Sequence, residues 1–359
     1  MDGLRGVAAL VVVVHHALLV SPTLAHEYQA AGNSGNPAVR ILVDTPLHLL
    51  WGGGEAVMVF FILSGMALTL PLLSGRPAHW LAYYPRRMIR LYFPVWSAAA
   101  FAIALFILFP RSAIDGGSWW LNKHDIPLTA HAVSRDVTLV LGSTFINSPL
   151  WSLRWEVLFS LALPLYFYLA KRFGQGWFGG GVLAASVLVA VGLGGRLENP
   201  YLLYLPVFVL GVLLAVNRQS LENALAKQSA RVSWSLMVVA LIALTGSWIP
   251  GLRDTIAAVP VTATGGTLLV ALVAWRDEYR VLGTSQVIAW LGTISFSLYL
   301  IHEPILMSIA FHFEEPNAAV VLAVGLPLSL FIAWGFHLLI EGPSNTFSRA
   351  VGKFVATRS

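Results

Sequence analysis

The chain of 359 residues contains no cysteine and few charged residues. Without a thiol, the protein cannot form an acyl-cysteine intermediate, a thiolate metal site or a disulfide. Charged residues make up 11% of the chain, whereas about 25% is typical of a soluble domain. Hydrophobic residues make up 57%, and the mean hydropathy is +0.74. This composition predicts an integral membrane protein.

Several motifs that mark catalytic or ligand-binding sites are also absent. No HExxH pair indicates a zinc site, no Walker loop or GxGxxG fingerprint indicates a nucleotide site, and Ser64-Gly65 lacks the GxSxG elbow of serine hydrolases. We therefore expect no metal and no permanently bound cofactor. The basic pI of 9.6 does not indicate a nucleic-acid partner, because the cations lie between apolar segments, as the positive-inside rule describes.

Ten apolar segments approach the roughly 17 to 25 residues that cross a bilayer. This pattern predicts an all-α integral membrane bundle of about ten transmembrane helices. The segments cover residues 7–25, 55–73, 92–109, 154–170, 179–195, 201–217, 233–250, 256–275, 289–311 and 317–340. Residues 136–150 are apolar but short, which predicts one re-entrant or interfacial segment.

Most of the 22 basic residues fall in the loops on one side of these segments. The positive-inside rule makes that side cytoplasmic and places both termini there. The expected organisation is a transmembrane domain over residues 1–345, followed by a short basic cytoplasmic tail over residues 346–359. The protein is then a multi-pass protein of the lipid bilayer.

The first apolar segment carries two adjacent histidines, His15 and His16. Arg5 lies eleven residues before His16, a spacing that returns to nearly the same helical face about 16 Å along the axis. His15 is rotated by about 100° and lies off this stripe. An ionisable group near mid-membrane is costly and indicates a functional site, although such a histidine can also serve only as a polar contact between helices. A neutral histidine suits a general base.

Three further clusters carry chemistry. Arg86, Arg87 and Arg90 lie on the predicted cytoplasmic side, where arginine forks suit a phosphorylated ligand or serve as membrane anchors. Trp151 and Glu156 are predicted at the outer mouth of the fourth segment, where the indole is either a sugar platform or part of an interfacial belt. The third cluster is a polar helix face in the ninth segment that includes Tyr299 and His302. Such a face either lines a cavity or makes polar contacts with neighbouring helices.

Taken together, these motifs resemble the acyltransferase-3 family of bacterial inner-membrane O-acyltransferases over essentially the whole chain. Arg5, followed by ten residues and then His16, is similar to the family's Arg-x10-His signature. Phe60 to Gly65 is similar to its FFxLSG element, although Met58 stands where many members have an acidic residue. The remaining matches are Arg86-Arg87 with Arg90, Trp151 with Glu156, Tyr299 with His302, and Glu341 with Pro343.

The resemblance implies an enzyme of the bacterial inner membrane that uses acyl-CoA, above all acetyl-CoA, as co-substrate. The acceptor would be a hydroxyl of a surface carbohydrate or a lipid-linked glycan. The chain resembles a stand-alone form without the C-terminal periplasmic hydrolase-like domain of many members, and it leaves open a homo-oligomer.

The same resemblance assigns roles to the candidate residues. His16 is the general base or a transient acyl carrier, with Arg5 and Glu156 as its catalytic partners. The expected substrate-binding residues are Arg86, Arg87, Arg90, Ser64, Trp151, Tyr299 and His302. A rival from another class is a transporter or flippase for a small anion or a lipid-linked sugar, which would use the same buried charges for translocation. The absence of internal repeats argues against it.

Overall fold

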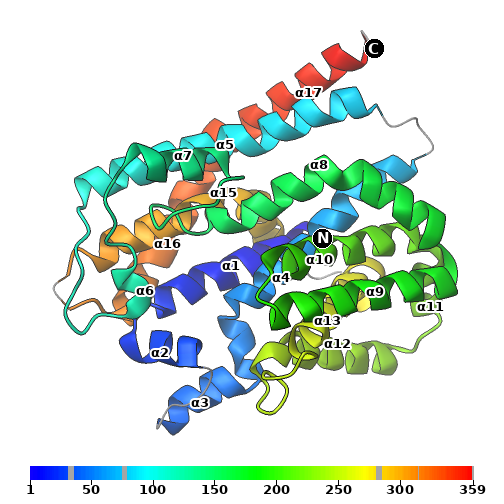
Figure 1. The fold of residues 1–359 in the computed structure, drawn as a ribbon, viewed down its shortest axis with the longest axis horizontal. Helices are drawn as coiled ribbons and strands as arrows, with labels where there is room; N and C mark the ends of the chain where they lie inside the picture. Colours follow the sequence, from blue (N-terminus) through cyan, green and yellow to red (C-terminus); the bar gives the residue numbers. More distant parts are fainter. Residues whose placement is uncertain (31–35, 75–78, 280–284, 314, 358–359) are drawn as a thin grey trace. The chain divides into compact units, whose positions relative to one another are not determined.

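The computed structural model describes residues 1–30, 36–74, 79–279, 285–313 and 315–357 (Figure 1). Over these ranges the regular structure is helical, and no β-strand occurs. The first half contains α1 (Asp2–Leu18), α2 (Pro22–Ala30), α3 (Pro37–Asp44), η1 (Pro46–Leu50), α4 (Gly53–Thr69), η2 (Leu70–Leu73), α5 (Trp80–Leu108), α6 (Trp119–Asn122), α7 (Ala130–Thr138) and α8 (Leu150–Phe173). The second half contains α9 (Gly176–Arg196), α10 (Pro200–Val216), α11 (Arg218–Ala226), α12 (Ala230–Leu244), η3 (Gly246–Trp248), α13 (Ala258–Trp275), η4 (Asp277–Tyr279), α15 (Gln286–Ala310), α16 (Ala318–Phe336), η5 (His337–Glu341) and α17 (Gly342–Ala356).

The helices confirm an all-α membrane architecture. Within the described ranges, seven helices are long and apolar enough to cross a membrane, and nine do so if each of two bent helix pairs counts as one span. Each of the ten predicted segments corresponds to a helix, but α12 has only 15 residues. The count of ten spans and the cytoplasmic position of both termini therefore remain predictions.

The first span differs from its predicted range of 7–25. Helix α1 already begins at Asp2 and ends at Leu18, and α2 then leaves at an angle of 111°. Pro22 explains the break, because a proline disfavours helical geometry in the preceding residue and begins a new helix readily. Arg5 and His16 thus lie on one continuous helix, as their spacing predicts.

The chain separates into two compact units. The first unit comprises residues 1–8, 40–78 and 161–292. Helices α4 and α10 pack closely in it, because Gly65 and Gly211 have no side chain at the crossing. A Cβ atom at Gly65 would overlap the carbonyl oxygen of Phe208, and one at Gly211 would overlap that of Ile62. Small residues allow such close backbone approach in membrane helices.

The second unit comprises residues 9–39, 79–160 and 293–359. Helix α17 lies alongside α5 in it (Figure 1). Ser344, Ser348 and Gly352 recur every four residues on α17 and are buried, so small side chains again mediate the contact. The segment predicted as a short basic tail, residues 346–359, is helical up to Ala356 and packs against α5, and residues 358–359 lie outside the described part.

The last predicted span also continues further than expected. Helices α16, η5 and α17 form a 39-residue helical run, about 58 Å at 1.5 Å per residue, whereas the hydrocarbon core is about 30 Å thick. A π-helical turn at η5 joins them without a stop. Within it, Glu341 accepts hydrogen bonds from Ser297 (2.6 Å) and His337 (3.0 Å).

Candidate active site

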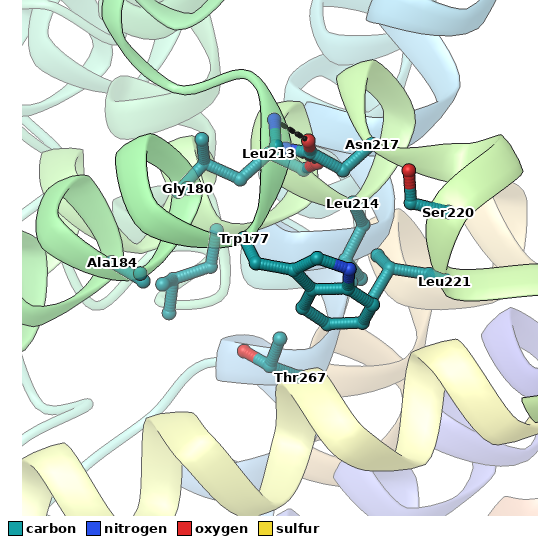
Figure 2. A pocket seen from close by; sticks show the side chains of 12 residues that line it. Trp177, Gly180, Ala184, Leu213, Leu214, Asn217, Ser220, Leu221 and Thr267 are labelled. Carbon is teal, nitrogen blue, oxygen red and sulfur yellow. Dashed lines mark hydrogen bonds between the residues drawn. The ribbon is translucent and has the colours of Figure 1, made fainter. Parts of the chain in front are cut away.

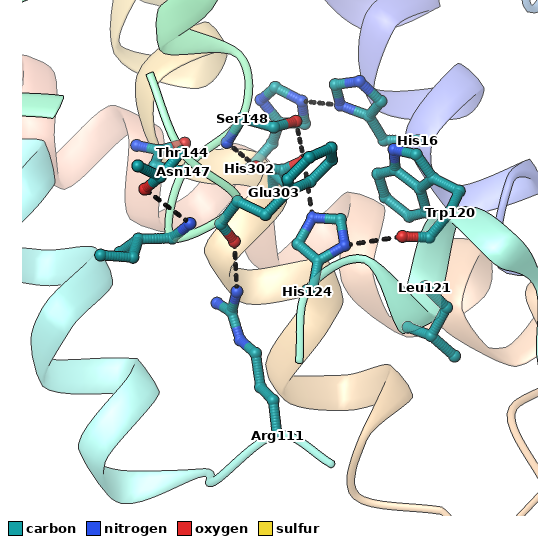
Figure 3. A network of polar contacts seen from close by, with 12 residues as sticks. His16, Arg111, Trp120, Leu121, His124, Thr144, Asn147, Ser148, His302 and Glu303 are labelled. Atoms are coloured by element: carbon teal, nitrogen blue, oxygen red, sulfur yellow. Dashed lines mark hydrogen bonds and ion pairs between the residues drawn. The ribbon is translucent and has the colours of Figure 1, made fainter. Parts of the chain in front are cut away.

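Two histidines from helices far apart in sequence form a direct hydrogen bond. Nδ1 of His16 on α1 lies 2.8 Å from Nε2 of His302 on α15 (Figure 3). The two rings are inclined by only 7° with their centroids 5.0 Å apart, as expected for an edge-to-edge hydrogen bond between coplanar rings. His302 is fully buried, whereas His16 is half-buried.

The partners of these rings determine their tautomers. Nδ1 of His302 lies 3.0 Å from the carbonyl oxygen of Leu298, which can only accept, so Nδ1 carries the hydrogen. In a neutral His302, Nε2 is then an acceptor, and Nδ1 of His16 must donate to it. This leaves the lone pair on Nε2 of His16, the arrangement that a general base requires.

A proline in α15 explains how this helix connects to the loop before α8. Pro304 has no N–H, so the carbonyl group of Leu300 lacks its usual helical partner. The side chain of Asn147 replaces it, with Nδ2 donating to the Leu300 oxygen at 2.9 Å. The loop therefore contacts α15 near its middle.

Glu303 directly follows His302 in the sequence and forms a second polar pair with His124. Both side chains are fully buried, and Nε2 of His124 is 3.1 Å from Oε1 of Glu303. Nδ1 of His124 lies 2.9 Å from the carbonyl oxygen of Trp120. This oxygen can only accept, so Nδ1 is the donor. A carboxylate facing Nε2 also needs a donor, so the pair shares one additional proton. Glu303 further accepts the backbone N–H and the hydroxyl of Ser148.

Trp120 joins the two polar pairs. Its ring centroid lies 5.3 Å from that of His16, with the planes inclined by 17°, and its carbonyl group holds His124. Ser118 begins this short helix, α6, by accepting the N–H of Leu121, as N-cap residues do. A one-turn helix thus positions an aromatic face against the candidate base.

The loop over residues 139–149 is held by buried polar contacts. Asp136 accepts the N–H of Thr144 at 2.5 Å and its hydroxyl at 2.9 Å. Burial raises the pKa of Asp136 to about 7, and the hydrogen bonds from Thr144 oppose this only in part. Leu139, the residue after α7, adopts a left-handed φ of 61°, which a non-glycine residue rarely does. Residues 136–150 therefore form the end of α7 and a coil rather than a crossing helix.

Arg111 approaches the same network from the end of α5 (Figure 3). It is 7% exposed, and its Nη1 donates to the carbonyl oxygen of Phe145 at 2.9 Å. Burial lowers the pKa of Arg111 to about 10, against the favourable effect of the Glu303 carboxylate. The side chain therefore stays cationic at neutral pH.

The structure corrects the predicted places of Arg87 and Glu156. We expected them on opposite membrane sides, but Nη2 of Arg87 lies 2.5 Å from Oε1 of Glu156. Nε of Arg87 also donates to the hydroxyl of Ser160 at 3.0 Å. Arg87 is buried in this contact, whereas Arg86 and Arg90 on the same helix are exposed.

The other predicted residues occupy varied positions. The hydroxyl of Tyr299 is buried, 2.7 Å from that of Ser152 and 3.1 Å from the carbonyl oxygen of Pro149, so it holds the start of α8. Trp151 is half-buried in the first turn of α8. Ser64 is buried in α4, in the first unit, next to the close crossing at Gly65.

Comparison with known protein families identifies the family of this chain. The sequence model of the acyltransferase domain of the acyltransferase-3 family matches residues 1–338. The chain belongs to the acyltransferase-3 family. It is similar to acyltransferase MdmB of Streptomyces mycarofaciens, with 26% identity over 331 residues, which cover 83% of this chain and 82% of that protein. No solved structure matches the chain.

This acyltransferase therefore brings together two of the predicted residues, His16 and His302, and pairs two others, Arg87 and Glu156. Sequence reasoning did not assign Trp120, His124 or Glu303 to the site. A signal existed for Glu303, a carboxylate next to a histidine within a predicted span. None existed for the other two, which lie in an irregular segment without periodicity.

Proposed function

We propose that this protein transfers an acyl group from acyl-CoA to a hydroxyl of a carbohydrate or lipid-linked glycan, with His16 as general base. The observation that carries the proposal is the hydrogen-bond chain from His16 through His302 to the carbonyl oxygen of Leu298. Membership of an acyltransferase family supports the reaction class. The chain lacks cysteine, so its own residues offer no acyl-thiol route.

The proposed reaction transfers the acyl group from the sulfur of coenzyme A to the oxygen of the acceptor. Nε2 of His16 takes the proton of the acceptor hydroxyl, and the oxygen attacks the thioester carbonyl carbon. The C–S bond breaks, and the coenzyme A thiolate takes the proton back from the imidazolium. His302 is a positioning residue in this scheme, because its Nε2 accepts the hydrogen of His16 Nδ1 and stabilises the imidazolium.

The proposed role of Glu303 and His124 is to hold the surroundings of the base. Glu303 binds His124 and Ser148, and His124 in turn fixes Trp120, whose face lies against His16. A buried, satisfied polar network of this kind restrains its members. The imidazole of His16 is thereby kept in one orientation while its Nε2 lone pair stays available.

The donor site is proposed at Arg86 and Arg90. Both lie exposed on α5, while Arg87 between them faces inward and is neutralised by Glu156. Exposed guanidinium groups one turn apart suit the phosphates of acyl-CoA, with acetyl-CoA as the expected form. In this proposal Arg87 stabilises the contact between α5 and α8 and does not bind the ligand. Arg5 on α1 is proposed to help position the donor.

The test uses the absence of cysteine. Because the chain has no thiol, a thiol reagent reports only coenzyme A released by the purified enzyme. We expect release with acetyl-CoA and a membrane glycan extract for the wild type and for His131→Ala, an exposed histidine outside the network. His16→Ala should abolish it. Mass spectrometry of surface glycans, at matched protein levels, should show an ester only with active protein.

The same experiment separates the alternatives. Full thiol release by His16→Ala would contradict the role of His16, both as a base and as an acyl carrier. An acyl group attached to His16 after mixing with acyl-CoA alone would indicate the covalent route instead. Thiol release from no variant, together with unchanged glycans, would favour a transporter.

A further inference from the structure

A cavity of about 220 Å³ lies in the first unit, and its lining includes no residue of the histidine network (Figure 2). Helices α9, α10, α11 and α13 contribute to its lining. Its walls are mainly apolar and include Leu210, Leu213, Leu214, Leu221 and the indole of Trp177. An apolar enclosure of this kind suits an aliphatic chain rather than a polar metabolite.

Small residues on α9 create the space. Gly180, Gly181 and Ala184 line the cavity from this helix. A Cβ atom at Gly181 would meet no heavy atom within 4 Å, so the volume beside it is open. A larger side chain at Gly181 would therefore fill the cavity without a backbone clash at its Cβ atom.

Asn217 also lines the cavity, and its amide group is already hydrogen-bonded within the protein. Its Nδ2 donates to the carbonyl oxygens of Gly174 (2.7 Å) and Leu213 (3.1 Å), and its Oδ1 accepts the N–H of Gly176 (2.9 Å). Both donors of the amide are thus used by the protein itself. The residue fixes the junction where α11 leaves α10 at an angle of 71°, and it offers little to a polar ligand.

The chain segments next to Gly176 and Asn217, two residues that line the cavity, carry an excess of positive charge. Lys171 and Arg172 are exposed on the last turn of α8, shortly before Gly174. Arg218 follows Asn217 directly, with 56% of its side chain exposed, and its Nε lies 4.0 Å from the carboxylate of Glu222, whose side chain is 46% exposed. Trp177 is 67% exposed and lines the cavity, as a tryptophan at a membrane interface would.

We propose that this cavity binds one acyl chain of an anionic membrane phospholipid, whose headgroup phosphate contacts Arg218, Lys171 and Arg172. The apolar lining accounts for the chain, and the three cations account for the charge of the headgroup. This site is separate from acyl transfer and does not depend on the function proposed above.

Tryptophan quenching tests the proposal on the full-length protein in lipid nanodiscs. Phosphatidylglycerol with brominated acyl chains is titrated into phosphatidylcholine discs, and the signal of Trp177→Phe is subtracted from the wild type. The control is Trp234→Phe, an exposed tryptophan on α12 that does not line the cavity. We expect the Trp177 component to saturate at a low lipid fraction, while the Trp234 component follows the bulk fraction.

Three variants sharpen the test. Gly181→Leu fills the open space and should abolish the saturable component, whereas Gly335→Leu, a glycine of α16 with equally open surroundings, should leave it unchanged. Arg218→Gln should weaken phosphatidylglycerol binding about five-fold, since a basic residue near an anionic surface contributes about 1 kcal/mol. Melting curves of both glycine variants verify folding.

The proposal is overturned if the Trp177 component follows the bulk lipid fraction, or if Gly181→Leu leaves it saturable. Equal saturation by brominated phosphatidylcholine, unaffected by Arg218→Gln, would also overturn it, because the cations would then have no role. Native mass spectrometry provides an independent measurement, in which retained phosphatidylglycerol should disappear in Gly181→Leu.

Discussion

Arg87 on α5 and Glu156 on α8 form a buried ion pair, with 2.5 Å between Nη2 and Oε1 and side chains only 9% and 16% exposed. Loss of one partner of a buried ion pair is destabilising, because it leaves the other charge unpaired and out of water. The pair therefore joins two helices within the second unit and keeps Arg87 away from a ligand.

We predict that Arg87→Met or Glu156→Leu alone lowers stability by roughly 3 to 5 kcal/mol. The double variant should lose less than either single one, since no uncompensated charge remains. Thermal melting in detergent measures this. The matched control is Arg218→Gln, which removes an exposed pair with Glu222 and should change stability by less than about 1 kcal/mol. Additive losses in the double variant would contradict the coupling.

Replacement of His302 tests the positioning of His16. His302→Phe removes the acceptor for His16 Nδ1 and should reduce the turnover rate about 100-fold or more, while KM for acyl-CoA stays unchanged. His302→Gln keeps a side-chain oxygen that can accept the same hydrogen and should retain part of the rate. Thiol release at varied acyl-CoA concentration separates kcat from KM. An equal loss in both variants would argue for a purely structural role.

Two glycines with opposite surroundings should respond differently to alanine. In Gly211→Ala the new Cβ would overlap the backbone oxygen of Ile62, which cannot rotate away, so we expect a loss of about 3 kcal/mol or more. In Gly181→Ala the Cβ meets open space, and alanine favours a helix by about 1 kcal/mol. Melting temperatures should fall in the first variant and stay or rise in the second. A similar fall in both would refute the close crossing of α4 and α10.

The sequence pattern predicted individual helices better than their depth and their partners. The prediction that Arg5 and His16 lie on one helix is confirmed, because both belong to α1 and helical geometry is local. The contact of His124 with Glu303 spans 179 residues, and no local pattern encodes it. The hydropathy pattern also predicted that α8 begins near the outer membrane surface. In the structure, the loop before α8 instead contacts α15 near its middle through Asn147. The positive-inside rule indicates on which side a loop lies, but not how deeply the next helix begins.

The raised pKa of Asp136 makes stability depend on pH. Its pKa is about 7 in the folded protein, well above the ordinary aspartate value of 3.8 that applies in an unfolded chain. Between about pH 4 and 7 the folded state therefore holds a proton that the unfolded state has released, so the free energy of unfolding falls as the pH rises. Full ionisation should cost on the order of a few kcal/mol.

We predict that the wild-type protein melts at a lower temperature at pH 8 than at pH 5, and that Asp136→Asn reduces this difference. Asparagine resembles the neutral carboxyl group and cannot ionise, while its side-chain oxygen still accepts the N–H of Thr144. The measurement is thermal melting of both proteins in detergent across this range. Because all other titrating groups are common to both proteins, the difference between the two curves reports Asp136 alone. Parallel curves would show that Asp136 is already ionised in the folded state. The loop over residues 139–149 would then be held by a carboxylate and not by a neutral carboxyl group.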